Sequence, residues 1–117
     1  MITSPKPEEK TAFLPQVKDM SVAVLKAKLA RGETLHLFDV RTREEWNEGN
    51  IATARLLLDI SSEELSALPK DAELVFQCRS GVRSANMAEQ FRQRGYTNVY
   101  NLTGGILAWQ KTRADTP

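Results

Sequence analysis

One stretch of the sequence combines a nucleophilic side chain with groups that stabilise negative charge. The apolar run Leu74-Val75-Phe76 leads through Gln77 to Cys78, and the residues that follow are Arg79, Ser80, Gly81, Val82, Arg83 and Ser84. A thiol attacks as its thiolate, and cationic side chains, backbone N–H groups and a helix N-terminus all favour that anion. We therefore predict a catalytic thiolate at Cys78, with residues 79–84 forming a loop that binds an anion.

This chemistry needs a strand that ends at Cys78 and a helix that begins shortly after it. Continuous apolarity over 74–76 is typical of a central parallel strand, and open parallel sheets bind ligands at the carboxyl ends of their strands. Arg92, Arg94 and Gly95 are typical of a helix C-terminus, which predicts a helix over about 84–94. Ser84 then either caps this helix or, like Ser80, donates a hydrogen bond to the sulfur.

The rest of the chain alternates strand-like runs with capped helical patterns. Besides the strand over 73–77, we expect strands over 35–40, 54–60 and 98–102. Helices are expected after Ser21, Thr42 and Ser61 and after the pair Gly104-Gly105, and the segments that begin at Thr42 and Ser61 fit capping boxes. The alternation predicts an α/β fold, with a mainly parallel sheet of about five short strands and helices on both faces.

Composition indicates a single globular domain. The chain has 117 residues, of which 41% are hydrophobic and 26% charged, which is enough for a core of its own. Three prolines lie within residues 1–15, so we expect a loosely docked or mobile lead-in there, the domain over 16–113 and a tail over 114–117. The sequence leaves the oligomeric state open.

Charge, hydropathy and cysteine usage exclude several function classes. A net charge of +1 argues against nucleic-acid binding, and no apolar run approaches the ~18 residues of a membrane span. The N-terminus does not resemble a secretory signal, which predicts a cytoplasmic protein with a reduced thiol. The chain has one cysteine and one histidine, His36, which excludes an internal disulfide, a CxxC pair and a cysteine or histidine metal cluster.

Each of these residues also has a simpler interpretation. A lone cysteine after a buried strand is usually an inert core residue, but the arginines, serines and glycine around Cys78 are hard to explain by packing. Asp39 is a possible general base, although an ion pair with Arg41 is the favoured role. Glu44 and Glu45 are better explained by capping than by glycosidase chemistry. A cysteine–histidine dyad with His36 is disfavoured by sequence distance, which alone does not exclude contact.

Three motifs in this order resemble single-domain rhodaneses, the thiosulfate-type sulfurtransferases. The segment 78–84 resembles their active-site loop. Phe38-Asp39-Val40-Arg41, followed by Glu44, Trp46 and Gly49, resembles their Asp-Val-Arg segment and the helix after it. Residues 101–109, which read Asn-Leu-Thr-Gly-Gly-Ile-Leu-Ala-Trp, resemble their C-terminal Gly-Gly-x-x-x-Trp signature. The resemblance covers about residues 17–112.

The resemblance implies a rhodanese-like fold and a two-step sulfur transfer without a metal or an organic cofactor. Cys78 would take the outer sulfur of a small anionic donor such as thiosulfate and pass it to cyanide, a thiol or a thiol protein. Arg79 and Arg83 would attract the donor, while Asp39 and Arg41 would support the fold. The alternative is a catalytically weak binding or regulatory module with the same loop.

Two local features refine this expectation. The related phosphatase loop is Cys-x5-Arg, whereas four residues separate Cys78 from Arg83 here and Ser84 stands at the phosphatase arginine position. The smaller loop favours a sulfur atom over a phosphate or arsenate group. The sequence departs from the usual Gly-His-Ile-x-Gly-Ala stretch, because Asn50 replaces the histidine and Thr53 the second glycine.

Overall fold

The computed structural model describes residues 16–114, and its centre is a five-stranded sheet in the order β1-β5-β4-β2-β3. All neighbouring strands pair in parallel. The strands are β1 (Lys18–Met20), β2 (His36–Asp39), β3 (Arg55–Leu56), β4 (Leu74–Gln77) and β5 (Val99–Leu102). The expected lead-in over 1–15 and residues 115–117 of the expected tail lie outside the described residues.

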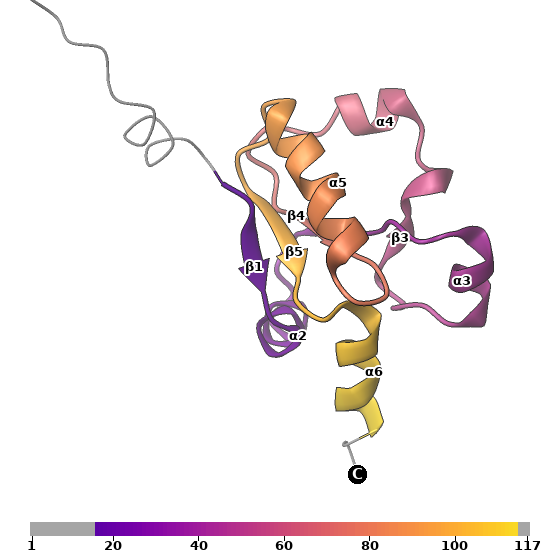
Figure 1. Cartoon of the computed structure of the whole chain (residues 1–117). Coiled ribbons are helices and arrows are strands. Elements are labelled where there is room, and N and C mark those ends of the chain that lie inside the picture. Colours follow the sequence, from indigo (N-terminus) through magenta and orange to yellow (C-terminus); the bar gives the residue numbers. More distant parts are fainter. Residues whose placement is uncertain (1–15, 115–117) are drawn as a thin grey trace, which may run out of the picture.

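Helices cover both faces of the sheet, as the alternating sequence pattern predicts (Figure 1). They are α2 (Val22–Ala30), α3 (Arg43–Glu48), α4 (Ser62–Ser66), α5 (Val82–Gln93) and α6 (Gly105–Ala114), with a 3-10 turn, η1 (Leu57–Asp59). Helices α2 and α6 contribute to one hydrophobic cluster, and α5 contributes to the other together with residues from α4. Within residues 16–114, no helix is long and apolar enough to cross a membrane.

The central strand β4 divides its side chains between the two clusters. Leu74 and Phe76 point into the cluster under α5, whereas Val75 points into the cluster under α2 and α6. All four residues of β4 are buried, as expected for a strand covered on both faces. Phe76 also contacts the rings of Phe38 and Phe91, at centroid distances of 5.5 and 4.8 Å. The central strand is therefore held rigidly up to the residue before Cys78.

The helix starts follow the predicted caps. The Ser21 side chain accepts a hydrogen bond from the backbone of Val24 at the start of α2. Thr42 and Glu45 form the complete capping box expected at α3. At α4 only half of the expected box forms: the Ser61 side chain accepts from the backbone N–H of Glu64, while the Glu64 carboxylate pairs with Arg55.

The expected strand over 54–60 is wrong in extent. Only Arg55–Leu56 pairs, with β2, and residues 57–59 turn as a 3-10 helix. This strand is at the edge of the sheet, so it has a pairing partner on one side only. Leu56 is buried whereas Leu58 is 71% exposed, so the leucine run does not mark a continuous buried strand.

One additional strand and one helix start differ from the sequence prediction. The edge strand β1 was not expected, because only Met20 of its three residues is buried and no alternating pattern can appear over so short a segment. Helix α5 begins at Val82 rather than near Ser84, and its N-cap is Gly81, whose φ of 110° and ψ of −4° suit a residue without a side chain. Ser84 therefore lies inside the first turn and does not cap the helix.

We expect the same leucine deletion to have very different effects at two positions. Leu74→Ala should lower the free energy of unfolding by about 2–5 kcal/mol, because Leu74 is fully buried in β4. Leu58→Ala is the matched control and should change it by no more than about 0.5 kcal/mol. Urea unfolding followed by circular dichroism measures both, and equal costs would contradict the observed packing.

Candidate active site

The site lies where the carboxyl ends of β2, β4 and β5 meet. Strand β4 runs into Cys78, β2 runs into the segment that holds Arg41, and β5 leads to Gly105. Along the chain, β2 is followed by its neighbour β3 on one side, and β4 by its neighbour β5 on the other. The chain direction across the sheet thus reverses between β2 and β4, which is where open α/β sheets form their binding crevice.

The Cys78 sulfur lies at the N-terminus of α5 and faces hydrogen-bond donors. The backbone N–H of Gly81 lies 3.1 Å from Sγ, and that of Ser84 lies 3.4 Å away. The Ser84 hydroxyl oxygen is 3.3 Å from Sγ. Cys78 is only 1% exposed, so these donors act in a site largely shielded from water. The positive end of the helix dipole adds to their effect.

The loop carbonyls face the opposite way, toward the first turn of α6. The N–H groups of Ile106 and Leu107 donate to the carbonyl oxygens of Cys78 and Arg79 at 2.8 and 3.2 Å. Because C=O and N–H point in opposite directions across a trans peptide, binding the Arg79 carbonyl turns the Ser80 N–H toward the sulfur. A backbone hydrogen bond from Ser80 is indeed among the interactions of the Cys78 thiol.

This arrangement requires glycine at position 105. A Cβ atom there would lie 2.3 Å from the Cys78 carbonyl oxygen and 2.6 Å from that of Arg79. The residue also has a φ of +59°, in the left-handed region. The second glycine of the Gly104-Gly105 pair thus allows α6 to approach the loop closely enough to bind both carbonyls.

The pKa of the Cys78 thiol reflects two opposing effects. Burial alone would raise the pKa, because it disfavours the charged thiolate. The hydrogen bonds from the Ser84 hydroxyl and from the N–H groups of Ser84, Gly81 and Ser80 favour the thiolate and outweigh burial. The net result is a pKa below the ordinary cysteine value, as a thiolate nucleophile requires.

Asp39 and Arg41 form a buried ion pair beside the loop. The Asp39 carboxylate accepts from Nε of Arg41 at 3.0 Å and from Nη2 at 2.8 Å, and both residues are at most 6% exposed. Arg41 also donates to the carbonyl oxygens of Glu45 and Gly49, at the middle and the end of α3. The pair therefore ties the carboxyl end of β2 to α3, and removing one partner would leave a buried charge uncompensated.

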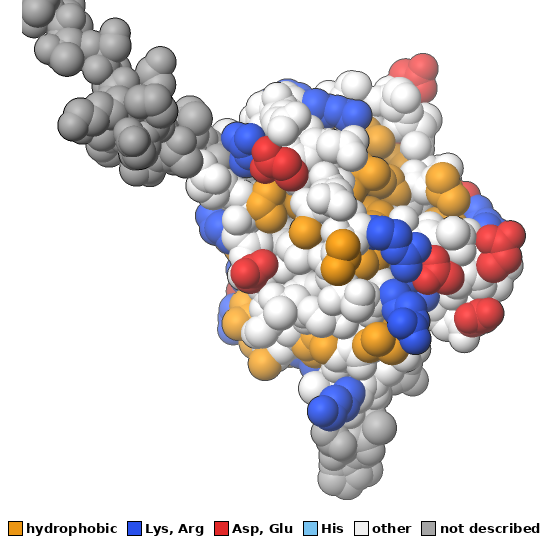
Figure 2. Space-filling model, viewed as in Figure 1, with side chains coloured by type: hydrophobic (Ala, Val, Ile, Leu, Met, Phe, Trp, Pro, Cys, Tyr) orange, Lys and Arg blue, Asp and Glu red, His pale blue; other side chains and the backbone are white. Residues whose placement is uncertain are grey.

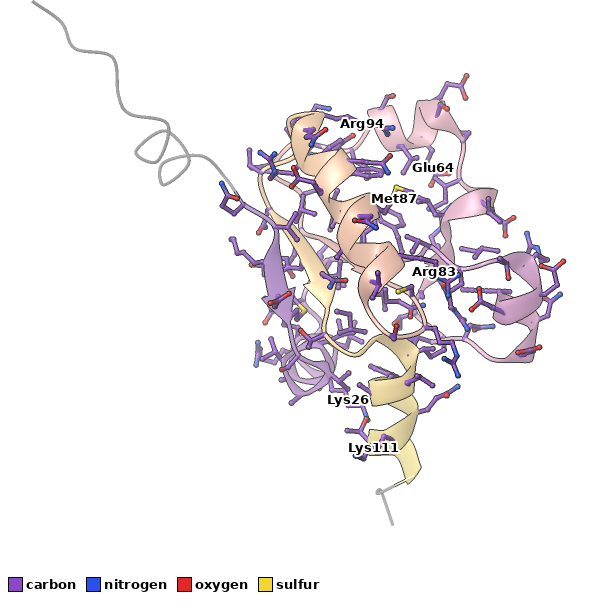
Figure 3. All side chains as sticks on the ribbon, viewed as in Figure 1. Lys26, Glu64, Arg83, Met87, Arg94 and Lys111 are labelled. Atoms are coloured by element: carbon purple, nitrogen blue, oxygen red, sulfur yellow. The ribbon has the colours of Figure 1, made fainter. Side chains whose placement is uncertain are left out.

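Arg83 does not point at the sulfur. Its guanidinium donates to both carboxylate oxygens of Glu45, at 2.7 and 2.9 Å, which links α5 to α3 (Figure 3). This ion pair, helped by the Thr42 N–H, lowers the pKa of Glu45 to about 2. The position that carries the arginine in the phosphatase loop is held by Ser84, which is fully buried against Cys78. At this position a serine rather than an arginine therefore contacts the sulfur.

Arg79 is the loop arginine whose charge is not neutralised by a close acid. It is exposed, and no ion pair involves it within the described part of the chain. Its side chain lines a hollow of about 250 Å³ between α3 and α6, together with Glu48, Gly49, Leu107 and Gln110 among others. On the face shown in Figure 2, basic and acidic side chains lie next to one another over α3 and the start of α5.

Other sequence candidates lie away from the sulfur. His36 pairs with Leu74 at the start of β4, so it stands at the opposite end of the strand from Cys78, and the dyad is wrong. Asn50 donates from its side chain to the carbonyl of Trp46 at 3.1 Å, at the end of α3. Thr53 is exposed in the turn before β3.

Sequence reasoning missed two contributors to the site. Asn101 of β5 hydrogen-bonds both the Ser84 hydroxyl and the Gly81 carbonyl, at 2.6 and 3.0 Å. Glu45 holds Arg83 in addition to capping α3. A polar residue within an otherwise apolar strand was the available signal for Asn101, whereas nothing in the sequence pairs Glu45 with a residue 38 positions away.

Comparison with known proteins places the chain in a family. Residues 21–112 match the model of the rhodanese-like domain. The chain belongs to the rhodanese-like domain family. A Bacillus subtilis protein provisionally named the sulfurtransferase YtwF is 41% identical over 96 residues, which cover 81% of this chain and 92% of that protein. The thiosulfate sulfurtransferase GlpE of Shewanella oneidensis is 29% identical over 101 residues, covering 83% and 96%.

The three-dimensional structure agrees with this assignment. A crystal structure of a rhodanese-like domain protein from Staphylococcus aureus has a TM-score of 0.69 and 33% identity, and the match covers 80% of this chain and 91% of that one. The rhodanese-like fold expected from the three motifs is therefore confirmed. The names of the relatives support a sulfurtransferase role at the level of the family.

The hydrogen bonds to Sγ predict how Cys78 ionises. We expect the midpoint of its alkylation rate against pH to lie lower in the folded protein than in the same protein unfolded in urea, where the donors are absent. Iodoacetamide labelling followed by intact mass spectrometry measures both profiles, and Cys78 is the only cysteine in the sequence. A folded-state midpoint equal to or above the unfolded one would show that burial prevails.

Proposed function

We propose that this protein is a sulfurtransferase that carries a sulfane sulfur as a persulfide on Cys78, with thiosulfate or a persulfide as donor and a thiol as acceptor. The observation that carries the proposal is the arrangement of donors around Sγ. Three backbone N–H groups and the Ser84 hydroxyl lie around this atom. Such a setting stabilises the Cys78 thiolate, which attacks in the first step and leaves in the second.

The first step forms one sulfur–sulfur bond and breaks another. The Cys78 thiolate attacks the outer sulfur of thiosulfate, and the electron pair of the broken bond leaves with sulfite. The product is a persulfide whose terminal sulfur carries the negative charge. Arg79, which forms no ion pair within residues 16–114, attracts the dianionic donor toward the hollow beside the loop, which Glu45 and Glu48 also line.

The second step returns the enzyme to its starting state. An acceptor, cyanide in an assay or a thiol in the cell, attacks the terminal sulfur, and the Cys78 thiolate leaves. Neither step needs a second cysteine, which suits a chain that has only one. A cytoplasmic location fits this chemistry, since a reducing compartment keeps Cys78 available as a thiol.

The loop dimensions favour sulfur transfer over phosphatase or arsenate chemistry. A tetrahedral oxyanion needs an arginine that wraps around it, and here Ser84 stands at that position with its side chain fully buried. Arg83, the next residue that could serve, is bound to Glu45 through both terminal nitrogens of its guanidinium group. A persulfide adds a single sulfur atom to Cys78 and needs no such arginine.

Intact mass spectrometry after incubation with thiosulfate tests the first step. We expect the reduced protein to gain about 32 Da, the mass of one sulfur atom, and to lose it again on addition of cyanide. Cys78→Ser should gain nothing, because the hydroxyl at that position is not a sulfur nucleophile.

A reactive Cys78 that gains no sulfur would contradict the proposal. If the protein takes no sulfur from thiosulfate or from a persulfide donor while Cys78 still reacts with iodoacetamide, the thiol is accessible and the transfer mechanism is wrong. The rhodanese-like binding or regulatory module would then be the function to pursue.

The ion pair between α3 and α5 predicts how donor affinity can be raised. Glu45→Gln keeps the capping box at α3, since glutamine serves there as well, but releases Arg83. We expect the KM for thiosulfate to fall by about two- to fivefold, the range of one exposed charge pair, with little change in kcat.

Glu44→Gln is the matched control for this change. Glu44 is the exposed neighbour of Glu45, and its replacement removes the same charge without touching Arg83. An equal fall in KM for both variants would mean that only net charge matters, and no fall for Glu45→Gln would remove Arg83 from donor binding.

A further inference from the structure

The buried side chain of Asn101 competes with the Cys78 sulfur for the hydrogen bond that the Ser84 hydroxyl can donate. Asn101 is 8% exposed and Ser84 is fully buried. The Ser84 oxygen lies 2.6 Å from Oδ1 of Asn101 and 3.3 Å from Sγ of Cys78. Both Asn101 and the sulfur therefore lie within reach of one hydroxyl group.

The orientation of the Asn101 amide follows from its second contact. Its Nδ2 lies 3.0 Å from the carbonyl oxygen of Gly81, and a carbonyl oxygen can only accept a hydrogen bond. Nδ2 must therefore face Gly81, which directs Oδ1 at the Ser84 oxygen. Two oxygen atoms only 2.6 Å apart need a proton between them, and only the serine hydroxyl can supply it.

The hydroxyl has one proton, so it cannot donate to Asn101 and to the sulfur at the same time. While its proton is on the Asn101 side, the lone pairs of the Ser84 oxygen face Sγ. A neutral sulfur tolerates them, and a thiol S–H can donate to them. A thiolate needs the proton instead, so the hydroxyl must turn from Asn101 to the sulfur.

We propose that Asn101 is a positioning residue that holds the Ser84 hydroxyl away from Cys78 while the sulfur is uncharged and yields it to the thiolate. This inference rests on the proposed function only in that Cys78 reacts as a thiolate. In the sulfur-transfer cycle, Sγ is uncharged in the persulfide and the hydroxyl returns to Asn101. The bond from the Ser84 hydroxyl still lowers the pKa of Cys78, but its net effect is reduced, because the bond gained at the sulfur is lost at Asn101.

A double-mutant cycle tests this competition. The variants are Ser84→Ala, Asn101→Leu and the two combined, and the measured quantity is the pH midpoint of Cys78 alkylation. In the native background, we expect Ser84→Ala to raise the midpoint only slightly, by less than about 0.3 pH unit. In the Asn101→Leu background, where nothing competes for the hydroxyl, it should raise the midpoint by about half to one pH unit, the effect of one hydrogen bond.

The double-mutant cycle separates this proposal from a purely structural role of Asn101, because only competition makes the effects of the two substitutions depend on each other. If Asn101 only braces the loop through Gly81, its loss shifts the midpoint by the same amount with and without the Ser84 hydroxyl, and the proposal is overturned. Asn86→Leu, the same replacement at an exposed site on α5, should leave the midpoint unchanged.

Two further readouts keep the test decisive. If Asn101→Leu does not fold, as judged by circular dichroism, Ser84→Ala in the native background decides alone: a rise above about 0.3 pH unit contradicts the proposal, and a smaller shift supports it. Alkylation uses no sulfur donor, so its outcome is independent of whether thiosulfate loads Cys78.

Discussion

The close approach of α6 to the loop after β4 is the constraint on which the site depends. Gly105 allows the first turn of this helix to bind the carbonyl oxygens of Cys78 and Arg79. Those bonds turn the backbone N–H of Ser80 toward the sulfur, and the N-terminus of α5 adds those of Gly81 and Ser84. Helix α6 therefore orients the loop by binding its carbonyl oxygens, and α5 supplies hydrogen-bond donors to the sulfur.

The three arginines around this loop have different roles, although the sequence alone does not distinguish Arg79 from Arg83. Arg41 is buried against Asp39 and joins β2 to α3, whereas Arg83 is bound to Glu45 and joins α3 to α5. Arg79 forms no ion pair within the described residues and lines the hollow. Two of the three arginines thus hold the surrounding elements in place through ion pairs, and Arg79 does not.

Much of the fold follows from local patterns. The Thr42 capping box and the apolar strand before Cys78 were predictable, because each depends on residues a few positions apart. The edge strands were not. Strand β1 has one buried residue, and β3 is two residues long, so their pairing depends on neighbours distant in the sequence rather than on their own composition.

The sequence alone predicted a reactive thiol at Cys78, the small residues of its loop and the helix that follows, because the apolar strand and the glycine at the turn are readable from residues a few positions apart. Only the tertiary structure decided how these groups are aimed. The bonds from Asn101 to Ser84 and Gly81, and the pairing of Arg83 with Glu45, join segments 17 to 38 residues apart. Such contacts exist only after the sheet has assembled, since its strand order brings β5 and α3 to either side of Cys78.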